Sequence, residues 1–217
     1  MNRLRCLYIA IMTSCLLLTA CSDEEYLYPE LITEFSNLKT DNTGVGNYLV
    51  TDDEEAFYIE NRGTLGGLKP DTTYRVVSRY ALNHAADQPT VALYGIEAAI
   101  SPIPVHESEF REIHTDAVEL QSIWKRQDYI NLVLRVKVKD TAHGFHFIEN
   151  KIAEEEGVRT LYLTLYHDRK DDIEAFYKTS YLSVPLWYYS NKLEKGDKIV
   201  FQLNTYKEGV TSRTFTY

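Results

Sequence analysis

Apolar side chains alternate with polar ones over most of this 217-residue chain. The clearest run places Ile130, Leu132, Leu134, Val136 and Val138 at every second position. Successive side chains of a strand point to opposite faces, so a period of two predicts a strand with one buried face. Segments with helical spacing are scarce. The pattern therefore predicts the all-β fold class.

The first half of the chain holds five alternating segments separated by turn-forming runs. These segments are residues 31–38, 48–51, 56–60, 74–82 and 90–100. Five short strands suit a small closed barrel of the OB type, because closure leaves no exposed sheet edge. An open five-stranded meander is the alternative. We expect a five-stranded OB-like β-barrel domain over residues 30–103.

Pro102 and Pro104 interrupt the pattern after the first half, because proline donates no ladder hydrogen bond and restricts the residue before it. Residues 114–217 then hold about seven alternating segments, which predicts an antiparallel β-sandwich domain. Residues 149–156 fit a helical turn or a loop. Pro185 predicts an edge strand or a bulge in its segment.

The first 20 residues have the layout of a secretory signal, with Arg3 and Arg5 before an apolar run that ends at Leu18. About twelve apolar residues cover roughly 18 Å, which is short of a hydrocarbon core of about 30 Å. Residues 18–21, Leu-Thr-Ala-Cys, resemble the bacterial lipobox, in which cleavage leaves an acylated cysteine as the first residue. We therefore expect residues 1–20 to be a lipoprotein signal peptide and Cys21 to anchor the protein to a membrane.

An acidic run follows the cysteine directly and consists of Ser22, Asp23, Glu24 and Glu25. It resembles the surface-export signal of lipoproteins of the Bacteroidota, and an ordinary solvated linker is the alternative. We expect residues 21–29 to form a short acidic tether. The resemblance implies a protein anchored by lipid in the outer membrane and facing the outside.

The charge of the chain argues against nucleic acid as a partner. The formal net charge is −9, and loss of the signal peptide removes two arginines and no acidic residue. Nucleic-acid binding depends on lysine and arginine that neutralise phosphates. Two of the three cysteines leave with the signal peptide and Cys21 is acylated, so the hydrophobic core must hold the fold without a disulfide.

Four features along the chain carry a family resemblance. They are Cys21 with its acidic run, residues 68–77, Trp124 with residues 128–132, and residues 195–199. Together they make the whole chain similar to the NigD-like lipoproteins of the Bacteroidota. The resemblance implies an N-terminal OB-like domain and a C-terminal β-sandwich. The family takes its name from a bacteriocin-associated operon and has no established activity, so the resemblance transfers no catalytic residues.

One sequence pattern suggests a metal ion. It consists of the histidines His143 and His146, with His167 and Asp168 further along the chain. Residues three apart on a strand point to opposite faces, so the first two cannot share an ion without a bulge. Ordinary strand histidines explain the pattern better. We predict no metal site and no cofactor.

Two carboxylate-rich runs, residues 52–55 and 168–172, lack the spacing of an EF-hand loop. We predict solvated turns there, with weak calcium binding as the alternative. Nucleophile elbows and Walker loops are absent from the sequence. A carboxylate pair for glycoside hydrolysis needs to meet only in space, and no feature selects one. We therefore expect a protein that is not an enzyme.

Seventeen tyrosines are the remaining unusual feature, and several fall on the face that alternation assigns to solvent. An exposed aromatic platform can stack on a sugar ring or hold a partner protein. Cross-strand aromatic pairs that stiffen a sheet are the alternative. The candidate ligand-binding residues are Tyr129, Tyr162, Tyr166, Tyr181, Trp187 and Tyr189.

These observations favour a surface-exposed outer-membrane lipoprotein that acts as a non-catalytic binding or interaction module, with a glycan or a protein as partner. A bacteriocin-associated accessory or immunity protein is the alternative. A carbohydrate-active hydrolase is the third hypothesis.

Overall fold

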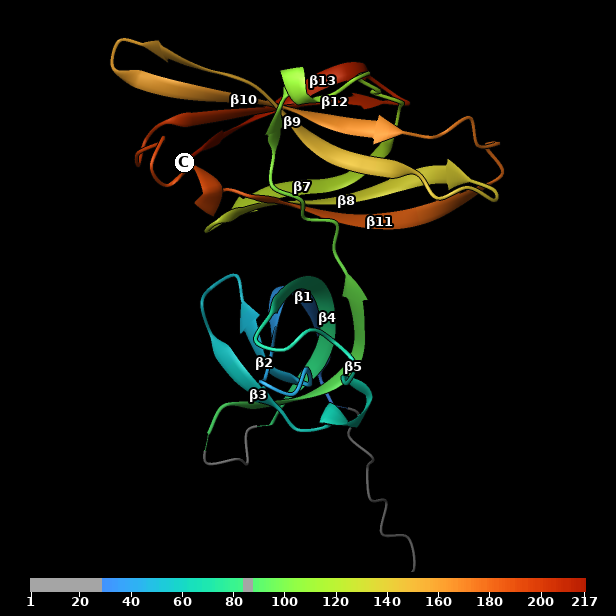
Figure 1. The fold of residues 1–217 in the computed structure, drawn as a ribbon, viewed down its shortest axis with the longest axis vertical. Coiled ribbons are helices and arrows are strands. Elements are labelled where there is room, and N and C mark those ends of the chain that lie inside the picture. Colours follow the sequence, from blue (N-terminus) through green and yellow to red (C-terminus); the bar gives the residue numbers. More distant parts are fainter. Residues whose placement is uncertain (1–28, 84–87) are drawn as a thin grey trace, which may run out of the picture. The chain divides into compact units, whose positions relative to one another are not determined.

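The computed structural model describes residues 29–83 and 88–217. The predicted signal peptide, the Cys21 anchor and the run from Ser22 to Glu25 lie outside these residues, so they stay predictions. Nearly all regular elements are β-strands (Figure 1). The all-β prediction is confirmed.

The first five strands close into a barrel in the order β1-β2-β3-β5-β4. Their bounds are β1 Ile32–Thr40, β2 Gly46–Thr51, β3 Ala56–Ile59, β4 Thr73–Asn83 and β5 Thr90–Ala98. A short 3₁₀ helix, η1 (Arg62–Thr64), follows β3. Side chains such as Leu38, Leu49 and Val91 fill the interior. The closed barrel confirms the prediction and excludes the open meander.

The remaining strands form two stacked sheets (Figure 1). One sheet has the order β13-β12-β10-β9-β6 and the other the order β11-β8-β7. The bounds are β6 Val105–His106, β7 Glu119–Arg126, β8 Tyr129–Val138, β9 Gly144–Glu155, β10 Val158–Asp168, β11 Phe176–Pro185, β12 Lys198–Thr205 and β13 Gly209–Thr216. The 3₁₀ helix η2 (Glu107–Glu109) follows β6 and η3 (Trp187–Tyr189) follows β11.

The strand directions differ in part from the antiparallel prediction. Most neighbouring strands are antiparallel, but β10 pairs with β12, and β6 with β9, in parallel. The chain leaves the larger sheet after β10 to form β11 in the smaller sheet and then returns as β12. Such a crossover brings the chain back in the same direction, which makes the pair parallel.

The core of the sandwich lies between its two sheets. Ile130, Leu132 and Leu134 of β8 are fully buried and belong to the same apolar cluster as Leu161 and Phe201 of the larger sheet. These are the alternating positions of the sequence. Burial of each such side chain stabilises the fold by about 1.5–3 kcal/mol.

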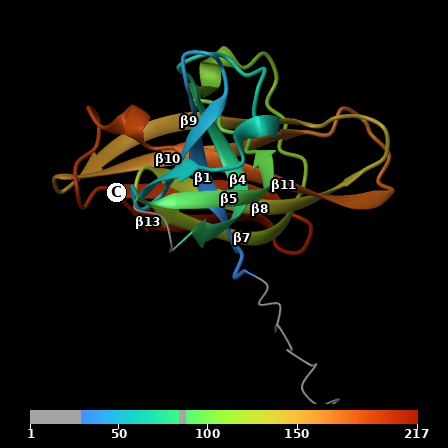
Figure 2. The same ribbon diagram turned by 90° about the horizontal axis from the view of Figure 1, so that it is seen from below.

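The prediction for residues 149–156 is wrong, because most of this segment is the second half of β9. β9 and β10 form one long hairpin, which runs side by side in both views (Figures 1 and 2). Glu156 and Gly157 have φ of 51° and 79°, the left-handed values of a tight two-residue hairpin turn. The end of the hairpin is mostly exposed, so its sequence shows no clear alternation.

Pro185 ends β11, which is the edge strand of the smaller sheet, as its proline predicts. The segment that follows the last barrel strand, around Ile100, lies against this edge. Tyr181 accepts a backbone hydrogen bond from Ile100 (2.8 Å), and Ile100 accepts one from Ser183 (3.0 Å). Residues 101–104 are not in a strand, as the two prolines predict. Barrel and sandwich both belong to one compact unit, Leu31–Tyr217.

Candidate functional site

A buried polar network joins the barrel to the sandwich. Arg75 of β4 donates through Nε to Ser183 Oγ (2.9 Å) and through Nη2 to Asp52 Oδ2 and Asn131 Oδ1 (2.9 Å each). Asn131 Nδ2 donates to Asp52 Oδ2 (2.7 Å), and Ser183 Oγ donates to Asn131 Oδ1 (2.7 Å). The side chains of Arg75 and Asp52 are each 5% exposed. The charges are therefore paired inside the protein, where an unpaired charge is costly.

The run of residues 52–55 is a turn in which Asp53, Glu54 and Glu55 are exposed, as the sequence predicts, but its first residue is not in solvent. Asp52 is buried against Arg75, with 2.6 Å between Oδ1 and Nη1. Asp53 accepts two hydrogen bonds from the guanidinium of Arg126 on β7. These two carboxylates are therefore used in ion pairs with arginines, a role that the local sequence does not show.

Tyr129 and Trp187 line one hollow beside this network, which we name the junction hollow. Its volume is about 430 Å³. It is lined by Asn37, Thr73, Tyr74, Arg75, Ala98, Ala99, Ser101, Tyr129, Pro185 and Trp187. The guanidinium carbon of Arg75 lies 3.7 Å from the ring centroid of Tyr129, and Trp187 is 44% exposed. The hollow thus combines aromatic faces with polar groups.

Tyr181 lines a different hollow, of about 280 Å³, together with Phe35 and Trp124. The ring of Phe35 packs edge-on against Trp124 (5.6 Å) and Tyr181 (6.0 Å). Alternation places Tyr129 and Tyr181 on the outer face of the smaller sheet, as predicted. The barrel strands β1 and β4 contact this face, however, so both tyrosines are only partly exposed.

The other three predicted residues are elsewhere. Tyr162 and Tyr166 lie on β10, where each is half-buried. Tyr189 is fully buried and its hydroxyl donates to Glu149 (2.9 Å), so its assignment to the solvent face is wrong. It lies in the 3₁₀ helix η3, where the period of two does not apply. The six residues therefore do not form one platform.

Of the predicted histidines, His146 lies in β9, His143 directly precedes β9 and His167 lies in β10. His146 pairs with Tyr166 across the hairpin, whereas His143 Nδ1 lies 2.9 Å from His167 Nε2. His167 Nδ1 faces the carbonyl of Asp116 at 2.9 Å and must donate to it, because a carbonyl only accepts. Burial lowers the pKa of His167. The prediction that His143 and His146 cannot share an ion is consistent with this arrangement.

A third hollow has a volume of about 620 Å³. His143, Phe145 and Phe176 are among its lining residues. The Nε2 atom of His143 is buried without a hydrogen bond, 3.6 Å from Asp172 Oδ2. Asp172 accepts backbone hydrogen bonds from Lys139 (2.7 Å) and Asp140 (3.2 Å). Asp172 is thus another buried carboxylate in a run that the sequence assigns to solvent.

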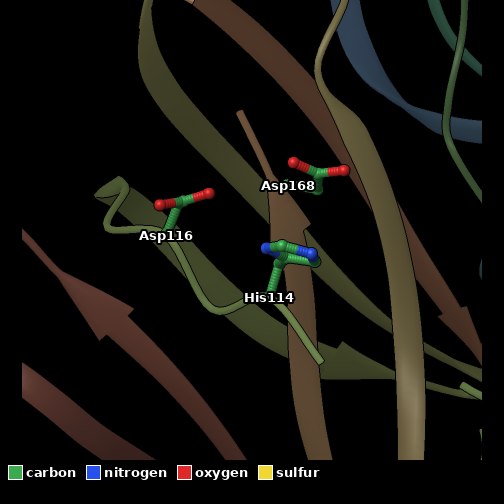
Figure 3. Close-up of side chains that lie close together, drawn as sticks. All are labelled: His114, Asp116 and Asp168. Carbon is green, nitrogen blue, oxygen red and sulfur yellow. The ribbon is translucent and has the colours of Figure 1, made fainter. Parts of the chain in front are cut away.

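His114, Asp116 and Asp168 bring their side chains together on the outer face of the larger sheet (Figure 3). One ligand atom from each lies within 4.8 Å of the others. The ring of Tyr166 packs edge-on against His114, 5.9 Å between centroids, and Phe110 stacks on Tyr166 at 5.1 Å. Burial raises the pKa of Tyr166, and so do the nearby carboxylates of Asp168, Glu112 and Asp116.

This group is absent from the sequence prediction, although the chain contains a signal for it. Glu112, His114 and Asp116 alternate with Ile113 and Thr115. In an extended segment such spacing points three potential ligands to one face. The segment precedes β7 and has no strong apolar pattern, and its partner Asp168 comes from β10. The three side chains come together only because the segment around Thr115 pairs with β10 at His167.

The sandwich part of the chain matches a known protein family. Residues 101–217 match the model of the NigD-like C-terminal beta sandwich domain. The whole fold is similar to a NigD-like immunity protein from Bacteroides caccae, with 30% identity and a TM-score of 0.73 over 88% of this chain and 99% of that chain. The chain belongs to the NigD-like family.

Two other solved structures share the fold of this NigD-like protein. A toxin-related protein from Parabacteroides distasonis has 17% identity and a TM-score of 0.65, over 87% of this chain and 93% of that one. A lipoprotein from Bacteroides fragilis has 13% identity and a TM-score of 0.59, over 87% and 97%. At such identities the likeness concerns the fold alone. A search of the curated proteins finds no match. Within residues 29–83 and 88–217, no helix has the length and hydropathy of a membrane span.

Proposed function

We propose that this NigD-like protein is a non-catalytic binding module, anchored through acylated Cys21 in the outer membrane and facing the outside. The junction hollow is the observation that supports this proposal, and the ligand that we propose for the hollow is a saccharide. Tyr74, Tyr129 and Trp187 offer flat apolar rings, while Asn37 and Thr73 supply polar groups beside them. Aromatic faces with a few placed polar groups are the usual composition of small-ligand sites, and about 430 Å³ is within their range.

Both tryptophans of the chain line hollows beside the buried network, Trp124 in one and Trp187 in the other. Intrinsic fluorescence therefore reports on both hollows. We suggest a glycan array with protein from Ser22 onward, followed by a tryptophan-fluorescence titration of a Trp124→Phe variant, in which Trp187 is the remaining tryptophan. A saccharide in the junction hollow changes this emission with a saturable dependence on concentration.

Trp187→Ala should weaken binding at least tenfold, because it removes a stacking face from the hollow. Tyr94→Ala is the matched control, since Tyr94 is 58% exposed on β5 and lies outside the hollow. Equal loss in the two variants, or no saccharide retained on the array, would exclude the proposed site.

The second candidate function is neutralisation of a protein toxin. It is favoured by the immunity protein of Bacteroides caccae, which has 30% identity, and by the net charge of −9, which suits a basic partner. A toxin gene beside the gene for this protein supports this candidate, and protection of cells that express the protein tests it. Unchanged killing by that toxin would contradict it.

A further inference from the structure

Two backbone hydrogen bonds set the positions of His114, Asp116 and Asp168. Thr115 forms a parallel bridge with His167 of β10. His167 donates to the carbonyl of His114, and Asp116 donates to the carbonyl of His167, each at 3.0 Å. Side chains next to a bridged residue point to the opposite face from it. His114, Asp116 and Asp168 therefore share the outer face. Figure 3 shows the three side chains close together.

The charge around these side chains suits a cation. Glu112 adds a third carboxylate, with its Oε2 3.6 Å from His114 Nε2. The backbone N–H of Lys170 donates to Asp168 Oδ1 (2.7 Å), and Arg169 brings a positive group to these carboxylates. Its backbone N–H donates to Asp116 Oδ2 (2.9 Å), while its Nε is 3.7 Å from Asp116 Oδ1 and its Nη1 is 3.5 Å from Glu174. One guanidinium, shared with Glu174, does not neutralise three carboxylates.

The kinds of ligand atom narrow the choice of metal. An imidazole favours zinc and other transition metals, whereas calcium and magnesium take mainly oxygen ligands. Zinc binds histidine nitrogen and carboxylate oxygen at about 2.0–2.2 Å, which sets neighbouring ligand atoms roughly 3.3 Å apart in a tetrahedron. The atoms in this group lie within 4.8 Å of one another, so the partly exposed side chains must rotate to reach that spacing.

We propose that His114, Asp116 and Asp168 bind one divalent transition-metal ion such as Zn²⁺. Three protein ligands leave a position open for water, for Glu112 or for a donor group from a partner. The site lies on the face of the larger sheet that carries Tyr166 and is separate from the junction hollow. This proposal departs from our sequence prediction of no metal site, which weighed His143 and His146 with residues 167–168 and two carboxylate runs but not the segment that contains His114 and Asp116.

Titration of the full chain in detergent with Co²⁺, without a histidine tag, tests the proposal. Co²⁺ has visible absorption bands that report nitrogen and oxygen ligands, and a near-ultraviolet charge-transfer band reveals thiolate ligands. We expect saturable 1:1 binding without the thiolate band, and displacement by Zn²⁺. Binding with the thiolate band alone would place the ion at a cysteine and overturn the proposal.

Two variants assign the ligands. His114→Ala and Asp168→Asn should each weaken Co²⁺ binding at least tenfold, and far-ultraviolet circular dichroism verifies that each still folds. His106→Ala is the control, because His106 is an exposed histidine outside the group. Unchanged affinity in folded His114→Ala, or equal loss in His106→Ala, would overturn the site.

Discussion

At the scale of single residues, buried charges distinguish this protein from an ordinary apolar sandwich. Arg75 and Asp52 form an ion pair that two further polar side chains, Asn131 and Ser183, complete. Among the described residues, Asp52 Oδ1 is buried without a hydrogen bond and depends on its ion-pair contact with Arg75 Nη1 at 2.6 Å. Removing one partner of a buried pair leaves an unpaired charge, which is costly. Each member of this network is therefore sensitive to substitution.

Arg75→Met should lower the free energy of unfolding by about 3–5 kcal/mol, because it leaves the Asp52 carboxylate buried and unpaired. Arg126→Met is the matched control. Arg126 pairs with Asp53 between the same parts of the fold, but the two side chains are 53% and 46% exposed. An exposed pair contributes about 0–1 kcal/mol. Urea denaturation measures both variants, and similar losses would contradict the role of burial.

Asp172 gives the protein an acid-sensitive component of stability. Hydrogen bonds from the backbone N–H of Lys139, and then of Asp140, lower the pKa of its carboxyl from 3.8 to about 2. The folded state therefore holds fewer protons than the unfolded state between these values. The stability that Asp172 contributes is present above about pH 4 and is lost as the pH falls toward 2.

Asp172→Asn should remove this component, so that the free energy of unfolding falls less steeply between about pH 4 and pH 2. The variant is also less stable than the natural protein at neutral pH. Asp171→Asn is the control, because Asp171 is exposed and asparagine tolerates its left-handed φ of 57°. Urea titrations across this pH range decide the matter. Equal slopes for Asp172→Asn and the natural protein would refute the assignment.

At the scale of elements, turns control how the strands of the barrel close. Gly44 follows β1 and has a φ of +77°. A Cβ at this position would lie 2.2 Å from the carbonyl oxygen of Leu68. The backbone N–H of Leu68 donates to the carbonyl oxygen of Gly44 (3.1 Å), and this hydrogen bond holds the two loops together. Only glycine allows this approach of two loops.

Gly44→Ala should destabilise the protein by clearly more than Gly67→Ala. Gly67 has a similar φ of +80°, but a Cβ there meets no atom within 4 Å. Gly67→Ala therefore costs only the left-handed strain of about 1–2 kcal/mol. Thermal unfolding of both variants measures the difference. Equal shifts of Tm would show that the loop around Leu68 moves aside easily.

The elements also explain where the sequence predictions succeeded. Strands that cover the core, such as β8 and β10, keep strict alternation because one face is buried along their length. The predictions failed at the exposed end of the β9 hairpin and at the helix η3, where no continuous buried face imposes a period. Pro185 predicted an edge strand correctly, because its missing N–H acts locally.

At the scale of the whole molecule, barrel and sandwich share one buried polar network. The chain from Leu31 to Tyr217 is one compact unit, and Arg75 links β4 of the barrel to β8 and β11 of the sandwich. We expect urea unfolding to give one transition, with the same midpoint by tryptophan fluorescence and by circular dichroism. Two separate transitions would show that the barrel unfolds independently.

The sequence by itself determined the all-β class, the division into a five-stranded first part and a sandwich, and most strand positions, whereas closure of the barrel was decided by the tertiary structure. The features that the sequence determined follow from local properties: alternation, proline and turn-forming residues act within a few neighbours. It also contained the family resemblance that the comparisons establish.

The tertiary structure alone decided which side chains meet. Tyr129 and Tyr181 have the alternation of exposed residues, yet the barrel covers much of their face. Asp52 comes from an acidic run and pairs with Arg75, 23 positions away in sequence. His114 and Asp116 reach Asp168 only because Thr115 pairs with His167. Alternation states which face a side chain takes, but contacts between distant segments determine what lies against that face.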